Sequence, residues 1–418
     1  MDRVRFCVVV LLVTLLSVSV ALGGGFQLNE HGTKAMGMGG AFSAQASDGS
    51  AMFFNPAGLA FQPGFHALIG VTPIIPSNKF GSATITETKM VSQTFFLPHV
   101  YASYCLDNGL AFGLAFYAPY GLGTEWPSTW AGRYQAVKTD LKSYYINPTI
   151  AYRISEKFAV GVGISYVFSD VKLDRKLQLA LPTVPPTLLP DGNLSLDANG
   201  HGIEFDAGVM FKPTPELSIG ASYRHSNEID YEGTAVFTNM SVLAPYFPGG
   251  TGSTTITFPN NIFAGIAYQV SKDFTLEADY QFIAWTTYDS LKVNIPLGPV
   301  GPTGRPLQGP SASAKDWGNA SMIRIGGQYK LGGLALRAGF IYDITPVPDK
   351  TLEPMLPDAN RYEGTVGIGY EFVKGISIDV AYQFILFQDR TVTNPPNSFP
   401  GTYNSNANLF GLSLAYAP

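Results

Sequence analysis

Residues that could carry out catalysis or bind a metal are few in this chain and widely separated. The five histidines, His31, His66, His99, His201 and His225, show no metal-ligand spacing of the His-Glu-x-x-His kind. The sequence contains neither a Gly-x-Ser-x-Gly nucleophile elbow nor a phosphate-binding P-loop. Gly37-Met38-Gly39-Gly40 lacks the spacing of a dinucleotide-binding turn. The sequence therefore predicts no enzyme active site, no metal site and no cofactor.

One pair of acids could do proton-transfer chemistry. Glu277 and Asp279 lie two residues apart, which places both carboxyl groups on one face of a predicted strand. Such a pair could act as general acid and base, but solvation in a polar barrel interior is the better interpretation. Over the whole chain 26 Lys and Arg stand against 31 Asp and Glu, a net charge of −5. That balance gives no basic excess for phosphates, so we expect no nucleic-acid partner.

The first 23 residues have the organisation of an export signal. Two arginines precede an apolar run from Phe6 to Leu22, and Ala21-Leu22-Gly23 supplies small residues at a cleavage site. We predict a signal peptide over residues 1–23, removed near Gly23 or Gly24. The alternative is a retained membrane anchor.

Beyond residue 23, the sequence predicts strands as the elements that would position any functional site. Only 14% of residues are charged, 13% are aromatic and 45 are glycine, a composition that favours strands and turns over helices. No other segment has 18 or more consecutive apolar residues, so a spanning role would have to be built from strands. Alternation supports this: one face carries Phe158, Val160, Val162, Ile164, Tyr166 and Phe168, and the other carries Ala159, Gly161, Gly163, Ser165 and Val167.

We predict fourteen strands, whose connections alternate between short and long. The ranges are 65–75, 92–105, 109–119, 138–154, 157–172, 202–212, 216–231, 254–270, 273–292, 319–330, 333–343, 361–372, 375–390 and 406–417. Short turns include Ser155-Glu156 and Leu331-Gly332, and long loops rich in Gly and Pro include 182–200 and 296–310. A soluble sandwich also alternates, but this pattern of connections is typical of an outer-membrane barrel. We therefore predict an all-β membrane protein, a 14-stranded antiparallel transmembrane β-barrel in a Gram-negative outer membrane.

Aromatic residues near the predicted strand ends are expected at the two membrane interfaces. They are Tyr101, Tyr104, Trp126, Trp130, Tyr144, Tyr145, Trp285 and Tyr288. In a soluble protein the same residues would belong to a core.

Residues 24–63 do not alternate. They are rich in Gly, Ala and Met, with small residues spaced as in short helices separated by glycines. An exposed tail of this apolarity would be unusual, and a barrel of this size has a lumen wider than its own side chains can fill. We predict that residues 24–63 form a small helical hatch that plugs a barrel made by residues 64–418.

Five short motifs follow one another along the chain: Gly25-Phe26-Gln27-Leu28-Asn29-Glu30, Asn55-Pro56-Ala57, Tyr120-Gly121-Leu122-Gly123-Thr124-Glu125, Ala151-Tyr152-Arg153 and Pro346-Val347-Pro348. Together they resemble the FadL/TodX family of outer-membrane transporters for long-chain fatty acids and other hydrophobic compounds. The resemblance spans nearly the whole mature chain. It implies a plugged fourteen-stranded barrel, with substrate captured at extracellular loops, transferred to a pocket in the barrel and released sideways through a wall opening.

The resemblance also implies substrate-binding residues. Arg175 falls where the family has a lumen arginine that faces the ligand carboxylate, and Phe26 is assigned to the same pocket. A guanidinium suits that role because it is always charged and binds a carboxylate bidentately. The alternative is an Arg175 paired with a nearby acid such as Asp170 or Asp174. Lys315 is close in order to a second basic pocket residue, but the alignment there is shifted and gives no match.

Gating residues follow from the same resemblance. Gly121 corresponds to the residue that kinks a wall strand, since glycine permits an inward bend and a local loss of pairing. The alternative is an ordinary glycine between strand and loop. Asn55, Pro56 and Ala57 are expected to form a rigid turn where the hatch meets the wall.

The expected partners are a fatty acid or hydrocarbon substrate and outer-membrane lipid, and the chain is expected to act passively and as a monomer. Two other functions were weighed against transport of hydrophobic compounds. A general polar-solute porin would have a lumen rich in opposed charges and no apolar plug, which the Met-rich hatch argues against. An outer-membrane lipid hydrolase would need a serine beside a histidine on the outer wall, and no such pair can be assigned.

Overall fold

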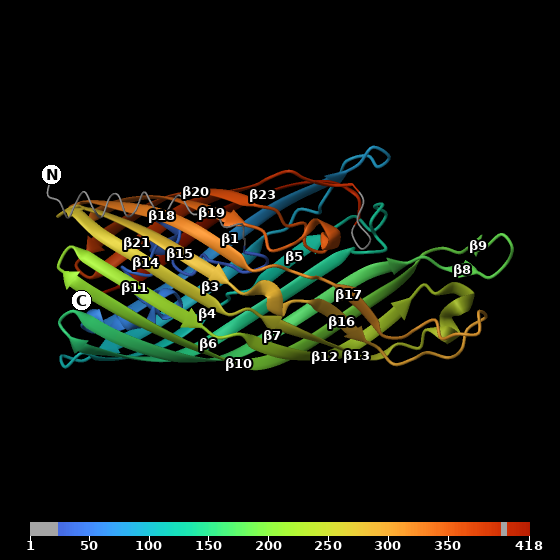
Figure 1. Ribbon diagram of the computed structural model, residues 1–418, viewed down its shortest axis with the longest axis horizontal. Helices are drawn as coiled ribbons and strands as arrows, with labels where there is room; N and C mark the ends of the chain where they lie inside the picture. Colours follow the sequence, from blue (N-terminus) through green and yellow to red (C-terminus); the bar gives the residue numbers. More distant parts are fainter. Residues whose placement is uncertain (1–23, 394–398) are drawn as a thin grey trace.

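The strands close into one antiparallel barrel in the computed structural model, which describes residues 24–393 and 399–418 (Figure 1). The predicted signal peptide, residues 1–23, lies outside the described residues. Along β7 (Phe158–Leu177) the side chains of Val162, Ile164, Tyr166 and Phe168 are exposed, whereas those of the residues between them are buried. The apolar face therefore points outward, as a lipid-facing wall requires.

Fourteen wall strands follow one another around the barrel, several of them interrupted. They are β1 (Gly64–Gly81), β3 (Phe95–Cys105), β4 (Leu110–Tyr117) with β5 (Gly121–Glu125), β6 (Lys138–Ser155), β7, β10 (Gly192–Thr214), β11 (Leu217–Arg224) with β12 (Asn227–Thr238), β14 (Asn261–Ser271) with β13 (Gly250–Phe258), β15 (Phe274–Ile283) with β16 (Ser290–Asn294), β18 (Ala320–Leu331) with β17 (Ser311–Ala314), β19 (Leu334–Ile344), β20 (Arg361–Val373), β21 (Ile376–Phe387) with β22 (Arg390–Val392), and β23 (Gly401–Tyr416). The last strand pairs with the first, which closes the barrel and removes its edges. The predicted fold class is confirmed.

The two rims differ as predicted. Short turns such as those between β6 and β7 and between β18 and β19 lie at the end of the barrel that carries the C-terminus, and long loops project from the other end (Figure 1). The loops carry the short strands β2 (Thr88–Lys89), β8 (Ala180–Leu181) and β9 (Thr187–Leu188), and the 3-10 helices η3 (Ser241–Tyr246) and η5 (Asp349–Thr351). A further 3-10 helix, η4 (Trp285–Thr287), lies between β15 and β16 within one wall strand. None of the helices in the described ranges has the length and apolarity needed to cross a membrane.

Several predicted strand limits were wrong. The predicted strand 254–270 is divided at Pro259, which has no backbone N–H to donate to a ladder. The predicted strand 273–292 is likewise divided by η4. The loop predicted over 182–200 is shorter, because β10 already begins at Gly192 and pairs with the extended end of β7.

Residues 24–63, called the hatch segment below, precede β1 and are almost entirely buried. The segment contains α2 (Thr33–Gly37), α3 (Ala51–Phe54) and η2 (Pro56–Phe61). α2 contacts β19, β20, β21 and β23, whereas η2 contacts β3, β4, β6, β7 and β10 on other parts of the wall. Contacts on strands all around the barrel place the hatch segment in the lumen.

Candidate functional site

The third wall strand is interrupted between β4 and β5. β3 pairs with β4 through Val100–Cys105, whereas within the described chain β5 forms a ladder only with β6. The first residues of β3, Phe95–Leu97, pair with β1 but not with β5. The wall therefore has a gap in its pairing beside Gly121, the first residue after the interruption.

The hatch segment supplies hydrogen bonds to the interrupted strand. The Leu28 N–H donates to the Pro119 carbonyl at 2.8 Å, and the Gly121 N–H donates to the Phe26 carbonyl at 3.1 Å. Buried backbone groups need such partners when a ladder stops. A Cβ on Gly121 would lie 3.0 Å from the Leu28 Cδ1 atom, so the hatch segment passes directly over this glycine.

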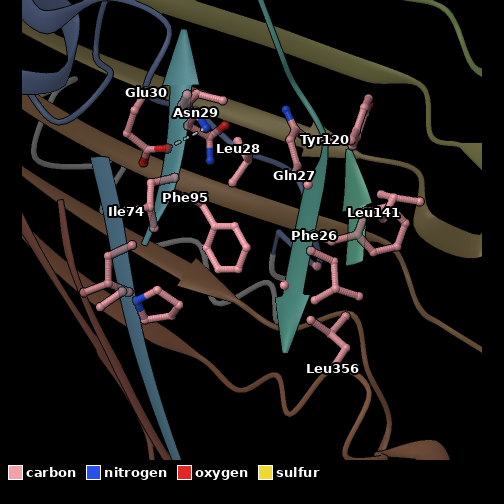
Figure 2. Close-up of a pocket in the computed structure, with 18 of the residues that line it drawn as sticks. Phe26, Gln27, Leu28, Asn29, Glu30, Ile74, Phe95, Tyr120, Leu141 and Leu356 are labelled. Atoms are coloured by element: carbon pink, nitrogen blue, oxygen red, sulfur yellow. Dashed lines mark hydrogen bonds between the residues drawn. The ribbon is translucent and has the colours of Figure 1, made fainter. Parts of the chain in front are cut away.

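A cavity of about 210 Å³ lies at this gap and is called the wall cavity (Figure 2). The Phe95 ring projects into it and lies so close over Gly123 that a Cβ there would overlap the ring. Phe96 also lines the wall cavity, and its side chain is 67% exposed on the outer face. The wall cavity thus extends from the hatch segment toward the lipid-facing surface, and Phe95 stands in the passage. Sequence reasoning missed Phe95, because nothing in its type or spacing marks it among the other phenylalanines.

Phe26 lies between the wall cavity and a smaller cavity of about 40 Å³, called the aromatic cavity. Its buried ring packs against five others at centroid distances of 4.5–6.3 Å, namely Tyr120, Phe258, Trp285, Tyr288 and Trp317. The structure therefore places this predicted substrate-binding residue at the junction of two cavities.

Lys315 lines the aromatic cavity with its charge already compensated. Its Nζ atom forms an ion pair with the Glu353 Oε1 atom. Burial lowers the pKa of Lys315 to about 8. The structure brings this lysine beside Phe26. Its role could not be assigned from the sequence, because its acidic partner comes 38 residues later in the chain.

Arg175 lines a third cavity of about 240 Å³, called the outer cavity, at the end of β7 that leads into a long loop. Apolar side chains of neighbouring strands, including Leu194 and Leu291, line this cavity together with charged ones such as Lys138 and Glu353. The Arg175 guanidinium makes no hydrogen bond or ion pair with any residue in the described part of the chain, and Asp174 instead accepts a hydrogen bond from Ser195. The pairing with Asp170 or Asp174 that the sequence left open is not observed.

The three cavities follow one another through shared walls. The outer and aromatic cavities share Thr139, Leu173, Leu291, Glu353 and Met355. The aromatic and wall cavities share Phe26, Leu122, Leu141 and Leu356. A largely apolar series of spaces thus links Arg175 at the loop end with the pairing gap at Gly121.

Asn55-Pro56-Ala57 lies where the hatch segment meets the wall. Asn55 Oδ1 accepts the Ala57 N–H at 3.2 Å, while its Nδ2 donates to the Ser43 carbonyl at 2.9 Å and to the Val209 carbonyl of β10 at 3.0 Å. Pro56 begins η2, where its fixed φ and missing N–H suit the start of a helix. Asn55 therefore ties two parts of the hatch segment to one wall strand.

Glycines on three adjacent strands make room for this turn: Gly161 of β7, Gly208 of β10 and Gly220 of β11. A Cβ on Gly161 would lie 2.5 Å from the Pro56 carbonyl carbon, and one on Gly208 would lie 2.8 Å from Pro56 Cδ. We call these three residues the glycine groove.

Glu277 and Asp279 are not solvated, which corrects the sequence-based interpretation. Asp279 Oδ2 accepts the N–H groups of Phe42 and Ser43 at 3.0 and 2.9 Å, and Glu277 Oε1 accepts that of Ala44 at 2.6 Å. The hatch segment excludes water from this face of β15 and replaces it with backbone donors. The acids position the hatch segment through these bonds.

The prediction of interfacial aromatic residues was largely wrong. Tyr104 is 50% exposed and Tyr144 is partly exposed on the outer face, as expected. The other six, Tyr101, Trp126, Trp130, Tyr145, Trp285 and Tyr288, are buried. An amphipathic ring packs as well against an apolar hatch segment as against lipid headgroups, so its type does not reveal which side it faces.

The sequence was compared with protein families and with individual relatives. Residues 14–417 match the model of the family described as outer membrane protein transport protein (OMPP1/FadL/TodX). The long-chain fatty acid transport protein of Salmonella typhi is 26% identical over 438 residues, covering 96% of this chain and 97% of the relative. Outer membrane protein P1 of Haemophilus influenzae is 23% identical over 462 residues with the same coverage.

Solved structures show the same fold. A Pseudomonas aeruginosa FadL homologue superposes with a TM-score of 0.84 at 20% identity, covering 94% of this chain and 100% of that one. The Pseudomonas putida toluene transporter TodX superposes with a TM-score of 0.70 at 21% identity, covering 94% and 98%.

Proposed function

Because the chain belongs to the OMPP1/FadL/TodX family of outer-membrane transport proteins, we propose that it takes up a long-chain fatty acid or a related hydrophobic compound across the outer membrane, passively and as a monomer. One relative is named for long-chain fatty acids and one structural neighbour for toluene, so acids and hydrocarbons are both candidate substrates. The hatch segment, residues 24–63, acts as the plug around which the substrate moves.

The observation that carries this proposal is the continuous, largely apolar series of cavities from Arg175 to the wall gap. An apolar chain loses roughly 0.8 kcal/mol for each CH₂ that it exposes to water, so a route lined by leucine, valine and phenylalanine favours it over a polar solute. The substrate enters the outer cavity from the long loops, passes Phe26 and leaves beside Gly121.

Release sideways into the bilayer is favoured over release into periplasmic water for the same reason. The wall gap is compatible with this exit because the hatch segment satisfies Gly121 and Pro119, so no long unpaired edge faces lipid. Phe95 and the Phe26–Leu28 backbone must move aside for a substrate to leave.

Arg175 supports a carboxylate at the outer end of the route. Its guanidinium is half-buried, lines a cavity that also contains Leu194 and Leu291, and has no partner in the described chain. A carboxylate would supply the charge and hydrogen bonds that the site lacks. Binding of this kind selects fatty acids over hydrocarbons.

Binding to the purified protein tests this assignment with Arg175→Gln. We expect fatty-acid affinity to fall roughly 10- to 100-fold, since a hydrogen bond to a charged group contributes about 1.5–3 kcal/mol, while toluene affinity stays the same. Arg133→Gln is the matched control, because Arg133 pairs with Asp191 outside the cavities. Equal fatty-acid affinity in all three proteins would exclude Arg175 as the carboxylate partner.

Liposome swelling distinguishes the proposed function from a general porin. Sugars should produce no swelling with the purified protein, whereas a labelled fatty acid should enter the bilayer. Rapid sugar entry would favour a porin, and release of free fatty acid from phospholipid would favour a hydrolase.

A further inference from the structure

The lipid-facing surface of the barrel carries a groove of about 710 Å³ across β4, β6, β7, β10 and β11, called the outer-wall groove. Its apolar, exposed rim consists of Phe112, Ile150, Val162, Ile164 and Phe205. Two small residues make this part of the wall concave. Ala207 lies between the larger outward side chains of Phe205 and Val209. Pro148 has no backbone N–H, and residues 147–148 of β6 are left out of the ladder with β7.

The outer-wall groove is separate from the proposed substrate route. It shares no lining residue with the wall, aromatic or outer cavity. The ladder between β7 and β10 passes beneath it without a break, from Phe158 to Leu177. On the lumen side, Asn147 Nδ2 donates to Ser165 Oγ at 2.8 Å and so joins the two strands at the Pro148 interruption. An occupant of the groove therefore comes from the bilayer and not from the lumen.

A polar group closes the end of the groove that is nearest the long loops. The Tyr223 hydroxyl donates its single proton to Asn260 Oδ1 at 2.7 Å, so His225 Nδ1–H donates to the Tyr223 oxygen at 2.8 Å. Asn260 Oδ1 also accepts the Ser226 N–H at 2.9 Å, which fixes the orientation of the amide. No group in the described chain accepts the two N–H groups of Asn260 Nδ2.

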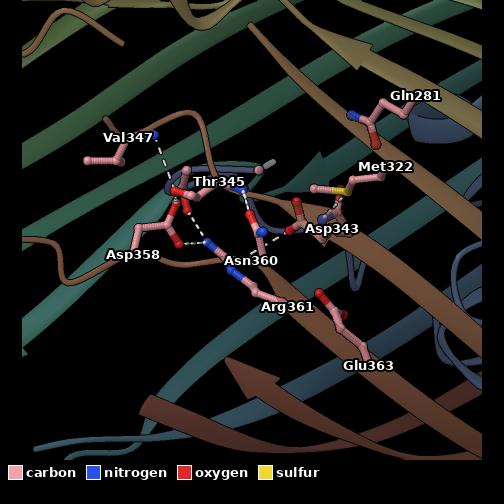
Figure 3. Close-up of polar contacts among 12 residues, drawn as sticks. Gln281, Met322, Asp343, Thr345, Val347, Asp358, Asn360, Arg361 and Glu363 are labelled. Atoms are coloured by element: carbon pink, nitrogen blue, oxygen red, sulfur yellow. Dashed lines mark hydrogen bonds and ion pairs between the residues drawn. The ribbon is translucent and has the colours of Figure 1, made fainter. Parts of the chain in front are cut away.

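Asn360, which precedes β20, shows an amide with both of its ends paired (Figure 3). Its Oδ1 atom likewise accepts a backbone N–H, that of Thr345, at 3.0 Å, but its Nδ2 atom donates to Gln388 Oε1 at 3.2 Å. Amide donors without an acceptor are unfavourable beside an apolar surface. The Asn260 amide therefore has room for an acceptor that a bound molecule would supply.

Charged residues on the outer face locate the boundary of the hydrocarbon layer. The outward side chains of β11 are Ile219, Ala221 and Tyr223, whereas the first outward side chains of β12 are Glu228, Asp230 and Glu232, all exposed. Carboxylates on the lipid face are unfavourable within the hydrocarbon layer. The polar group at Tyr223 therefore lies at the membrane surface on the long-loop side, and the groove extends from it into the outer leaflet.

We propose that the outer-wall groove binds one lipopolysaccharide molecule of the outer leaflet, with an acyl chain in the groove and a head-group oxygen at Asn260 Nδ2. The apolar rim matches the chain, because each CH₂ gains by leaving water for such a surface. The two amide donors match a phosphate, hydroxyl or carbonyl oxygen directly above the chain. A phospholipid of the periplasmic leaflet has its head group at the opposite rim and cannot make this contact.

Lipid retained by protein extracted in mild detergent tests the apolar part of this site, with native mass spectrometry as the readout. The wild-type protein should retain one lipopolysaccharide molecule. Ala207→Trp places an indole in the groove and should abolish this retention. Ala338→Trp is the matched control, because Ala338 is also exposed on the outer face, on β19, and lies outside the groove. It should retain lipopolysaccharide like the wild type.

Asn260→Asp tests the polar contact, since it keeps the size and the acceptor of the side chain but removes both donors. Retention should fall roughly tenfold, the effect expected for one lost hydrogen bond to a charged group. Asn319→Asp is the control. Asn319 Oδ1 also accepts a backbone N–H, that of Thr286, at 3.4 Å, but Asn319 does not line the groove.

Retention is measured without transport, so this proposal and the proposed function fail independently. Uptake of a labelled fatty acid should be the same in all four variants, because the groove shares no residue with the route. Heat-resistant mobility in detergent gels identifies folded variants, and Asn260→Asp decides alone if Ala207→Trp lacks it. Wild-type protein that retains no lipid or only phospholipid, or unchanged retention in a folded groove variant, would overturn the proposal.

Discussion

Among the basic side chains that line the proposed route, Lys315 and Arg175 have surroundings that give them different roles. Lys315 is neutralised by Glu353, whereas Arg175 has no partner in the described chain. A paired ammonium adds little net attraction for an anion, while an unpaired, half-buried guanidinium adds more. On the proposed function, the charge that selects a carboxylate therefore lies at the loop end of the route.

The pH dependence of binding follows from this difference. Arg175 keeps its proton throughout the range from pH 7 to 9, and a fatty-acid carboxylate stays ionised there, so affinity should be flat. The pKa of Lys315, lowered by burial, is about 8. If Lys315 held the carboxylate, it would lose its charge as pH rises through that value, and affinity would fall. Calorimetry between pH 7 and 9 distinguishes the two outcomes.

At the scale of elements, the interrupted third strand and the hatch segment form one unit. The strand loses its pairing with β3 after β4, and the hatch segment forms hydrogen bonds with the Pro119 carbonyl and the Gly121 N–H instead. A strand kept open in this way depends on the position of the hatch segment. Changes to either element should therefore affect exit more than binding.

Gly121→Val tests the exit. The new side chain would press on Leu28, and overpacking of this kind costs about 1–3 kcal/mol, so we expect uptake to fall roughly tenfold while fatty-acid binding by purified protein stays near normal. Gly364→Val is the control, since a Cβ there has no neighbour within 4 Å. Normal uptake by the Gly121 variant would exclude lateral exit at this position.

Asn55→Ala tests the attachment of the hatch segment. It removes three hydrogen bonds, and each buried group left without a partner costs about 1–3 kcal/mol, so transport should be impaired. The barrel itself should stay heat-resistant in detergent, because the ladders are untouched. Asn108→Ala, in a rim turn, is the control; wild-type transport by both variants would remove the role assigned to Asn55.

The sequence predicted the strands more accurately than it predicted whether inward-facing side chains meet solvent or the hatch segment. The alternation along β7, together with the short and long connections, predicted the outward apolar face correctly, because lipid accepts only apolar side chains on that side. Side chains that face the lumen can be polar or apolar, because the hatch segment contacts both kinds there. Glu277 was therefore expected in solvent and Trp285 at an interface, whereas both are buried. Long-range pairs such as Lys315 with Glu353 leave no local pattern at all.

At the scale of the molecule, the route is driven by the transfer of apolar surface out of water. A long hydrocarbon chain has a lower free energy in the bilayer than in periplasmic water. The protein needs to supply only a path and a first binding site. No external energy source enters this scheme.

Collapse of the proton gradient in intact cells should accordingly leave initial binding and entry of a labelled fatty acid unchanged. Measurements over the first seconds separate outer-membrane entry from later metabolism. A fall in initial binding on uncoupling would show that the barrel is energised.

The position of the hatch segment has a consequence for the order of folding. The segment leaves the ribosome before any of the barrel strands, yet its bonds reach Asp279, 237 residues away, and Arg361, 336 residues away. Contacts of such separation form late, because a long chain must close before they are made. The beginning of the chain is thus the last part to acquire its structure. A chain truncated before β19 would lack β19, β20, β21 and β23, the strands that α2 contacts.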